Sequence, residues 1–153
     1  MIKVLFICHG NICRSPMAEF VMKEYVRQAG MEREFRIDSA AVSPEELGNP
    51  IYPPVRRLLR EHNIPFTEHY ARVITRKDYE AYDHIIVMDR SNLRWLSRII
   101  GEDRDGKVSL LLHWAGREDS VADPYYSGDF TATWQDVTEG CRALMEALCR
   151  GRG

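Results

Sequence analysis

A cysteine and an arginine lie close together near the start of the chain, in the run CHGNICRS. Five residues separate Cys8 from Arg14, and the hydroxyl residue Ser15 follows at once. A loop this short can wrap around one tetrahedral anion, so that backbone N–H groups and the guanidinium fork of Arg14 bind its oxygens. The same positive surroundings lower the pKa of a thiol, which is about 8.5 in a free cysteine. We therefore predict an anion cradle that holds a thiolate nucleophile.

The cradle is predicted to lie where a strand turns into a helix. The remaining residues expected to surround the anion are His9, Gly10, Asn11, Ile12, Cys13 and Ser15. The apolar stretch over 3–7 predicts a buried strand, and Pro16 begins an amphipathic segment that ends at Gly30. Ser15 is a suitable N-cap for that helix. A helix N-terminus then points its free N–H groups at the anion.

A second group is needed because a thiolate that attacks a phosphate ester must expel an alkoxide or phenolate. That step requires a proton donor on the far side of the phosphorus. Asp123 in the run VADPYY offers one, because Pro124 restricts it to extended backbone and stiffens the loop. Tyr125 and Tyr126 would supply aromatic walls for a substrate cleft. An Asp-Pro pair alone more often marks an ordinary turn, so the assignment depends on its pairing with the Cys8 loop.

Short apolar runs alternate with amphipathic stretches along the rest of the chain. Further strands are predicted over 35–41, 84–88 and 108–112. Helices are predicted from Pro53 to His62, from Thr75 over a short stretch, from Ser91 to Gly101, and from Phe130 over a long C-terminal segment. Apolar strands separated by helices indicate a parallel sheet covered on both faces. Ligands bind at the carboxyl ends of such strands, which is where Cys8 stands.

Composition narrows the class of protein. The 153 residues, 44% hydrophobic and 29% charged, suit one soluble domain over 1–153. A net charge of −2 leaves no broad basic field, so nucleic acid is not an expected partner. The opening MIKVLFI is too short for a secretory signal, and no apolar run approaches membrane-spanning length. Two of the four cysteines share one loop and two share one helix, as in a reducing compartment, so we expect a cytoplasmic protein without membrane insertion.

These residues also have simpler interpretations. Cys8, His9 and Cys13 could ligate a metal, but no fourth ligand lies at a suitable spacing. Cys141 and Cys149 fall on one apolar helix face and are better explained as packing residues. The chain contains neither GxGxxG nor a glycine-rich loop that ends in Gly-Lys-Ser/Thr, which disfavours nucleotide binding.

Four motifs, taken in order, resemble the low-molecular-weight protein tyrosine phosphatases over nearly the whole chain. They are CHGNICRSP from Cys8, DSA at 38–40, MDRSNL at 88–93 and DPYY from Asp123. The resemblance implies an α/β fold, a three-layer α/β/α sandwich with a four-stranded parallel sheet, phosphatase I-like with flavodoxin-like topology. It also implies hydrolysis of phosphotyrosine in proteins and of small aryl phosphates through a phosphocysteine, without a metal or organic cofactor.

The resemblance further implies residue roles. Cys8 is the nucleophile, Arg14 the phosphate clamp, and Asp123 the general acid that later activates water. Ser15 corresponds to a hydroxyl that hydrogen-bonds the thiolate. Residues expected to support the loop from behind are Asn11, Ser39, His62 and Asp89. Cys13 corresponds to a second cysteine that can form a reversible disulfide with the nucleophile.

One position departs from the family pattern. Glu45, in the run SPEEL, stands where many members place an aromatic residue on the rim of the cleft. An acidic rim disfavours peptides with acidic residues beside the phosphotyrosine and favours basic ones. The expected partner is a phosphotyrosine-containing protein, such as a bacterial tyrosine kinase. We expect a monomer, with a weak dimer through Tyr125 and Tyr126 as the alternative.

Three other functions compete with this interpretation. A thioredoxin-linked arsenate reductase shares the fold and loop but needs further cysteines on a mobile segment, and none occurs between Cys13 and Cys141. By analogy with the family, a phosphoarginine phosphatase would favour a small β-branched residue in the loop, and the same analogy associates Ile12 with phosphotyrosine. A non-catalytic phosphotyrosine-binding module would lack Cys8 or Asp123, and both are present.

Overall fold

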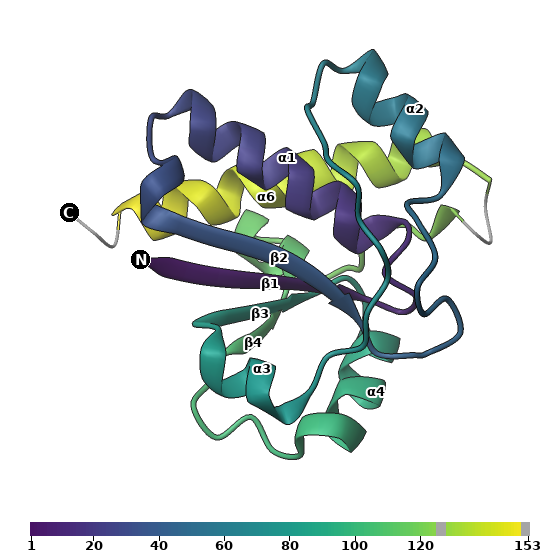
Figure 1. Ribbon diagram of the computed structural model, residues 1–153. Helices are drawn as coiled ribbons and strands as arrows, with labels where there is room; N and C mark the ends of the chain where they lie inside the picture. Colours follow the sequence, from purple (N-terminus) through teal and green to yellow (C-terminus); the bar gives the residue numbers. More distant parts are fainter. Residues whose placement is uncertain (125–127, 151–153) are drawn as a thin grey trace.

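The computed structural model describes residues 1–124 and 128–150, and its centre is a parallel sheet (Figure 1). The strands are β1 Ile2–Cys8, β2 Phe35–Ala41, β3 His84–Val87 and β4 Val108–Leu110. They lie in the order β2-β1-β3-β4, and all three pairings are parallel. The chain therefore changes winding direction between β1 and β3, so the loops after these two strands diverge and leave room for a ligand. The predicted four-stranded parallel sheet is confirmed.

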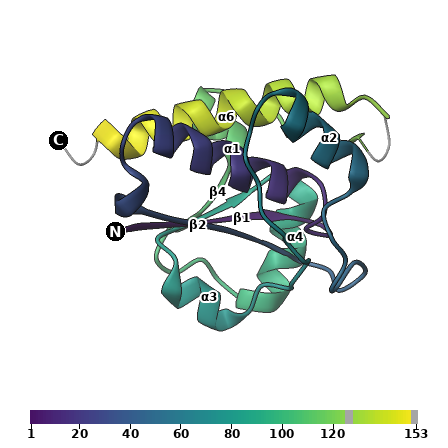
Figure 2. The ribbon, with the colours of Figure 1, turned by 45° about the horizontal axis from the view of Figure 1, so that its top comes forward.

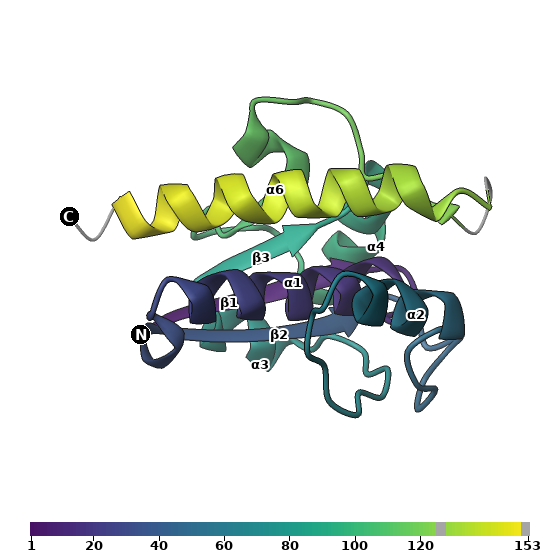
Figure 3. The same cartoon turned by 90° about the horizontal axis from the view of Figure 1, so that it is seen from above.

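Helices cover both faces of this sheet. On one face lie α1 Arg14–Gln28, α2 Pro53–Glu61 and α6 Phe130–Arg150, and on the other α3 Arg76–Ala81 and α4 Arg90–Ile100 (Figures 1 and 2). Two 3-10 helices are also present, η1 Glu32–Glu34 and η2 Leu111–Ala115. Figure 3 shows α1 and α6 side by side along the sheet. The predicted three-layer sandwich is confirmed. None of the described helices is long and apolar enough to cross a membrane.

The side chains of β1 alternate between two hydrophobic clusters, one on each face of the sheet. Val4, Phe6 and Cys8 belong to the cluster that α1 and α6 cover. Leu5 and Ile7 belong to the cluster on the α3 and α4 side. Successive side chains of a strand point to opposite faces, so the apolar run Val4 to Ile7 can be buried completely only with helices on both sides. The same alternation directs Cys8 to the face where α1 begins.

Several element boundaries differ from the sequence-based prediction by one or two residues, and two of these differences affect how segments pack. The helix expected from Ser91 has Asp89 as its N-cap, because the Asp89 carboxylate accepts a hydrogen bond from the N–H of Asn92 at 2.8 Å. The strand expected over 108–112 ends at Leu110. The chain turns there into η2, which brings its two buried leucines against α6.

Helix α6 approaches η2 closely at a glycine. A Cβ atom built on Gly140 would lie 2.5 Å from Leu111 Cγ, a separation that real Cβ atoms essentially never show. Hydrogen alone fits at this position, so Gly140 allows α6 to lie directly on η2. The chain runs on from η2 toward Asp123, and Ala122 contacts the same helix.

Candidate active site

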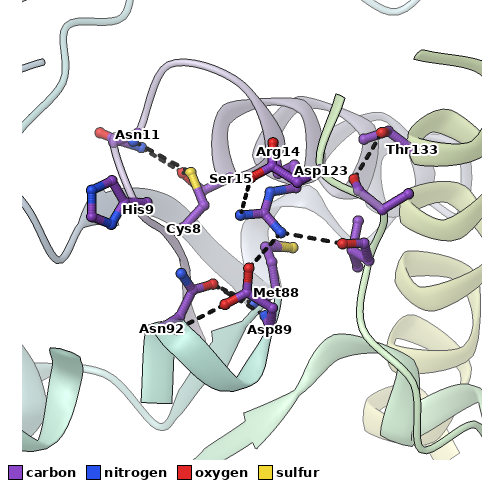
Figure 4. Close-up of polar contacts among 12 residues, drawn as sticks. Cys8, His9, Asn11, Arg14, Ser15, Met88, Asp89, Asn92, Asp123 and Thr133 are labelled. Atoms are coloured by element: carbon purple, nitrogen blue, oxygen red, sulfur yellow. Dashed lines mark hydrogen bonds and ion pairs between the residues drawn. The ribbon is translucent and has the colours of Figure 1, made fainter. Parts of the chain in front are cut away.

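Cys8 is the last residue of β1, is 3% exposed and lies inside a tight loop, here called the Cys8 loop (residues 8–15; Figure 4). The backbone N–H of Asn11 donates to Cys8 Sγ at 3.3 Å. The Ser15 hydroxyl lies 3.0 Å from the same sulfur. The prediction that Ser15 is the N-cap of α1 is wrong, because α1 begins at Arg14 and its N-cap is Cys13, which makes no side-chain cap bond. Hydrogen bonds from a backbone amide and a hydroxyl stabilise negative charge on sulfur.

Asn11 connects the Cys8 loop to its surroundings. It is fully buried and has a φ of 60°, in the left-handed region that asparagine adopts more readily than most residues. Its Nδ2 donates to Ser15 Oγ at 2.8 Å and to Ser39 Oγ at 3.0 Å, and its Oδ1 accepts from the N–H of Arg72 at 3.2 Å. The side chain thus fixes both the loop and the hydroxyl that contacts the nucleophile.

The histidine that contacts the loop is His69, and the expectation for His62 is corrected. His69 Nε2 lies 3.2 Å from the carbonyl oxygen of Asn11 and 3.1 Å from its Oδ1. His62 lies at the C-terminal end of α2, where its ring stacks on Trp134 with 4.2 Å between centroids. The assignment fails because α2 ends at Glu61 and the chain then returns toward the loop, bringing the later histidine to it.

Glu19 is a second residue that the sequence analysis missed. It is 5% exposed, accepts a hydrogen bond from the Ser39 hydroxyl at 2.6 Å and lies 3.7 Å from His69 Nδ1. Lys23, one turn later on α1, contacts its other oxygen at 2.6 Å. The available signal was its place among the apolar residues of α1, since a carboxylate there must find polar partners.

Arg14 contacts residues from several separate parts of the chain. It is 3% exposed, and its Nη1 donates to Asp89 Oδ2 at 2.9 Å and to the carbonyl oxygen of Val121 at 3.2 Å. Its Nη2 lies 3.4 Å from Asp123 Oδ2. Burial acts to lower the pKa of Arg14, but the negative charges around it outweigh burial and raise the pKa above its ordinary value. The guanidinium is therefore cationic and fixed in place.

Asp89 reaches Arg14 because it follows β3, the neighbour of β1 in the sheet. Its backbone is fixed as well, since Asn92 Oδ1 accepts hydrogen bonds from the N–H groups of Met88 and Asp89 at 3.0 and 3.1 Å. One carboxylate oxygen caps α4 and the other binds Arg14. Asp89 thus couples the start of α4 to the guanidinium.

Asp123 arrives from the other side of the site, in the segment between η2 and α6 (Figure 4). Its side chain is 29% exposed, in contrast to 4% for that of Arg14. The Asp123 side chain is therefore partly open to solvent on one side and faces a buried cation on the other. Tyr125 and Tyr126, predicted as cleft walls, lie outside the described residues.

The two cysteines of the loop have different environments. Burial raises the pKa of the Cys13 thiol strongly, and the charge of Cys8 adds to this effect. Cys13 is therefore a protonated thiol near neutral pH. All four cysteines of the chain are free, and Cys141 and Cys149 lie on α6. The reversible disulfide between Cys8 and Cys13 stays a prediction.

The predicted rim residue Glu45 contacts the loop itself. Its Oε2 lies 3.2 Å from His9 Nε2, and the two side chains are 67% and 36% exposed. The His9 ring also stands edge-on to Trp95, with 5.3 Å between centroids. A Cβ atom on Gly10 would lie 3.0 Å from Glu46 Cγ, so the loop passes tightly beneath the acidic pair. This side of the rim is acidic, with a histidine partner.

Another side of the rim is aromatic and was not predicted from the sequence. The N–H of Tyr52 donates to the carbonyl oxygen of Ile12 at 2.9 Å, which attaches this residue to the loop. Tyr52 stacks on Phe130 with 6.2 Å between centroids and is 45% exposed. An aryl group near the anion would find an apolar surface here.

Other hollows of the surface lie away from the Cys8 loop. Two of them, of about 470 and 570 Å³, flank β4 and are lined by no residue of the loop. A cradle for a single tetrahedral anion needs no comparable depth. Within residues 1–124 and 128–150, no group of three or more histidine, cysteine, aspartate or glutamate side chains is arranged to hold a metal ion.

Comparison with known proteins gives one consistent result. The family described as Low molecular weight phosphotyrosine protein phosphatase matches the chain over residues 3–152. The low molecular weight protein-tyrosine-phosphatase YfkJ of Bacillus subtilis is 35% identical over 150 residues, which cover 97% of this chain and 96% of that protein. The low molecular weight phosphotyrosine protein phosphatase of Homo sapiens is 39% identical over 148 residues, or 94% and 93% of the two chains.

The solved structures agree with the sequence matches. The crystal structure of YfkJ from Bacillus subtilis superposes with a TM-score of 0.95 at 34% identity and covers 100% of this chain and 98% of the other. Similarity of this extent includes the sheet, the helices on both faces and the loops at the carboxyl ends of the strands.

Proposed function

Because this chain belongs to the low molecular weight phosphotyrosine protein phosphatases, which are hydrolases of phosphotyrosine in proteins, we propose that its Cys8, Arg14 and Asp123 carry out that hydrolysis in two steps. The observation that carries this assignment is the set of contacts made by Arg14. One buried guanidinium meets Asp89 and Asp123 while lying in the same loop as Cys8. A nucleophile, a cation and an acid thus surround the space that a phosphoryl group would enter.

In the first step the Cys8 thiolate attacks phosphorus and a P–S bond forms. The P–O bond to the tyrosine ring breaks, and Asp123 in its acid form gives its proton to the departing phenolate oxygen. The loop N–H groups and the fork of Arg14 bind the non-bridging oxygens as the charge on them rearranges. The products are free tyrosine on the protein substrate and a phosphocysteine at Cys8.

In the second step water attacks the phosphocysteine. The Asp123 carboxylate, left ionised by the first step, takes a proton from that water as the new P–O bond forms. The P–S bond breaks, its electron pair returns to Cys8, and inorganic phosphate leaves. Ser15 and the N–H of Asn11 stabilise the sulfur as its negative charge returns. Each turnover therefore restores the starting thiolate and the acid form of Asp123.

The proposed roles are tested by assays without added metal. Cys8→Ser should abolish turnover of p-nitrophenyl phosphate and of a phosphotyrosine peptide. Asp123→Asn should slow hydrolysis of phenyl phosphate by about a hundredfold or more, because a phenolate leaves poorly without a proton. Arsenate, supplied together with reduced thioredoxin as the electron donor, and phosphoarginine serve as competing substrates in parallel assays. Turnover by Cys8→Ser, or faster conversion of either competitor, would contradict the proposal.

We further propose that the rim selects phosphopeptides with basic neighbours. The Glu45 side chain is mostly exposed and already pairs with His9, so we expect the effect of its charge on peptide binding to be modest. The ratio of kcat/KM for basic over acidic peptides should fall about two- to fivefold in Glu45→Tyr. Glu32→Gln is the control, since Glu32 is an exposed acidic residue in η1, which precedes β2 at the end of the sheet away from the Cys8 loop. An unchanged ratio in Glu45→Tyr would refute this preference.

The partner we propose is a phosphotyrosine-containing protein such as a bacterial tyrosine kinase, acted on by a monomer in the cytoplasm. A thiolate nucleophile works only while reduced, and four free cysteines suit a reducing compartment. Substrate trapping tests the partner. The Asp123→Asn variant should retain a phosphotyrosine protein that the parent releases, and capture of proteins without phosphotyrosine would count against the proposal.

A further inference from the structure

The two residues that precede Asp123 are held from several directions. Val121 is 2% exposed, its N–H donates to the carbonyl oxygen of Met88 at 2.9 Å, and its carbonyl oxygen accepts from Arg14 Nη1 at 3.2 Å. These contacts attach the segment to the end of β3 and to the phosphate clamp. They fix the position of Val121 relative to the Cys8 loop, two residues before Asp123 in the chain.

The next residue, Ala122, is held by α6. Its N–H donates to Asp136 Oδ2 at 3.0 Å, and its carbonyl oxygen accepts from Thr133 Oγ1 at 2.8 Å (the Thr133 contact is drawn in Figure 4). Thr133 and Asp136 are three positions apart on α6, so both face the same side of the helix. Two side chains of one helix thus bind both backbone polar groups of the residue immediately before Asp123.

Arg117 in turn orients Asp136. Its Nη1 lies 3.0 Å from Asp136 Oδ1, which leaves the other carboxylate oxygen for the N–H of Ala122. Arg117 also contacts Asp119, and hydrogen bonding to that residue raises the pKa of Arg117 above its ordinary value. The Asp136 side chain is 14% exposed, so this charge-assisted contact is partly shielded from water.

We propose that Thr133 and Asp136 are positioning residues for the general acid, aligning Asp123 through the backbone of Ala122. The inference rests on the proposed role of Asp123. A proton reaches the leaving oxygen only if the carboxyl group lies within hydrogen-bond distance of it, and displacements of about 1 Å at a catalytic group can cost about a hundredfold in rate. Neither residue touches the substrate, so both act only through Asp123.

The test compares two substrates that differ in their need for an acid. For Asp136→Ala and for Thr133→Val, kcat/KM on phenyl phosphate should fall about tenfold, as expected when alignment is partly lost. The loss on p-nitrophenyl phosphate should stay under about twofold, since p-nitrophenolate leaves with little protonation. Inhibition by inorganic phosphate should be unchanged, because the Cys8 loop is intact. If one variant fails to fold, the other still tests the alignment.

Three matched variants make the test specific. Glu139→Gln alters a second partner of Arg117 on α6 that makes no hydrogen bond to 121–123 in the described part of the chain, and it should leave both substrates unaffected. Thr133→Ser keeps the hydroxyl and should recover the loss of Thr133→Val. Asp136→Ala added to Asp123→Asn should cause no further loss on phenyl phosphate, since the group it aligns is gone.

Two results would overturn the inference. An equal loss on both substrates would mean a general structural role, and no loss on phenyl phosphate would mean that alignment does not depend on α6. If Asp123→Asn itself lacked selectivity for phenyl phosphate, the proposed function would fail. If Asp123→Asn were selective while Asp136→Ala and Thr133→Val were not, only the positioning role would fail.

Discussion

The Cys8 loop and the acid segment (residues 117–124) meet at Arg14 but are held in different ways. The loop is fixed by buried, mostly neutral groups centred on Asn11. The acid segment is fixed by partly exposed ion pairs and by one helix, and its Asp123 side chain stays 29% exposed. The proposed anion site requires dipoles that do not reorganise, whereas the proposed proton transfer requires that the attacking water molecule can reach the Asp123 carboxylate. The two constructions match these two requirements.

The largest effect is expected where the two regions join. Arg14→Lys keeps the charge but loses the guanidinium fork, whose Nη1 contacts Asp89 and Val121 and whose Nη2 lies near Asp123. We expect kcat/KM on p-nitrophenyl phosphate to fall about 10²- to 10³-fold. Arg27→Lys is the control, an exposed arginine on the same helix that pairs with Glu24. A loss of less than about threefold in Arg14→Lys would show that a point charge suffices.

The next effect concerns the stability of the loop. Asn11→Ala removes the partner of several buried polar groups and places alanine at a positive φ, so we expect the free energy of unfolding to fall by about 2–4 kcal/mol. Asn63→Ala is the matched control, because Asn63 is exposed and has a φ of 58°. Asn63→Ala should lower the free energy of unfolding by only about 1 kcal/mol. If denaturant unfolding showed equal losses of unfolding free energy in the two variants, the buried hydrogen bonds of Asn11 would contribute nothing to stability.

A smaller contrast separates the two thiols of the loop. Burial raises the pKa of Cys13, so its thiol stays protonated, and only thiolates react with alkylating agents. At pH 7 iodoacetamide should modify Cys8 at least about tenfold faster than Cys13, as read by peptide mass spectrometry. Added phosphate should slow the reaction at Cys8 alone. Faster modification of Cys13 would contradict the assigned environments.

The smallest effect tests the ion pairs of the acid segment. Hydrogen bonding to Arg117 lowers the pKa of Asp119 below its ordinary value of 3.8. The unfolded chain then binds a proton more readily than the folded one, so this contact stabilises the fold above pH 3.8 and is lost as the pH falls through the folded-state pKa. Asp119→Asn should melt slightly below the parent at pH 7, by less than Asn11→Ala. The difference should vanish in strong acid, and a constant difference from pH 3 to 7 would refute the linkage.

Residues that the local sequence brings together were predictable. Cys8 and Arg14 share one short run, and strands alternating with helices required a parallel sheet with Cys8 at its carboxyl edge. The choice between His62 and His69 was not predictable, because it depends on where α2 ends and how the chain returns. Tertiary packing brings α6 beside Ala122, so nothing in the local sequence around Thr133 or Asp136 indicates their contacts.

The close contact at Gly140 makes the protein vulnerable at a position with no chemistry of its own. Even one added methyl group would force α6 or the Leu111 side chain to move. The same helix carries Asp136 one turn earlier, so such a shift would be transmitted through Ala122 to Asp123, the proposed proton donor. A random screen for inactive variants should therefore recover substitutions at this buried glycine alongside those of the nucleophile, and the two kinds would differ in which leaving groups they still release.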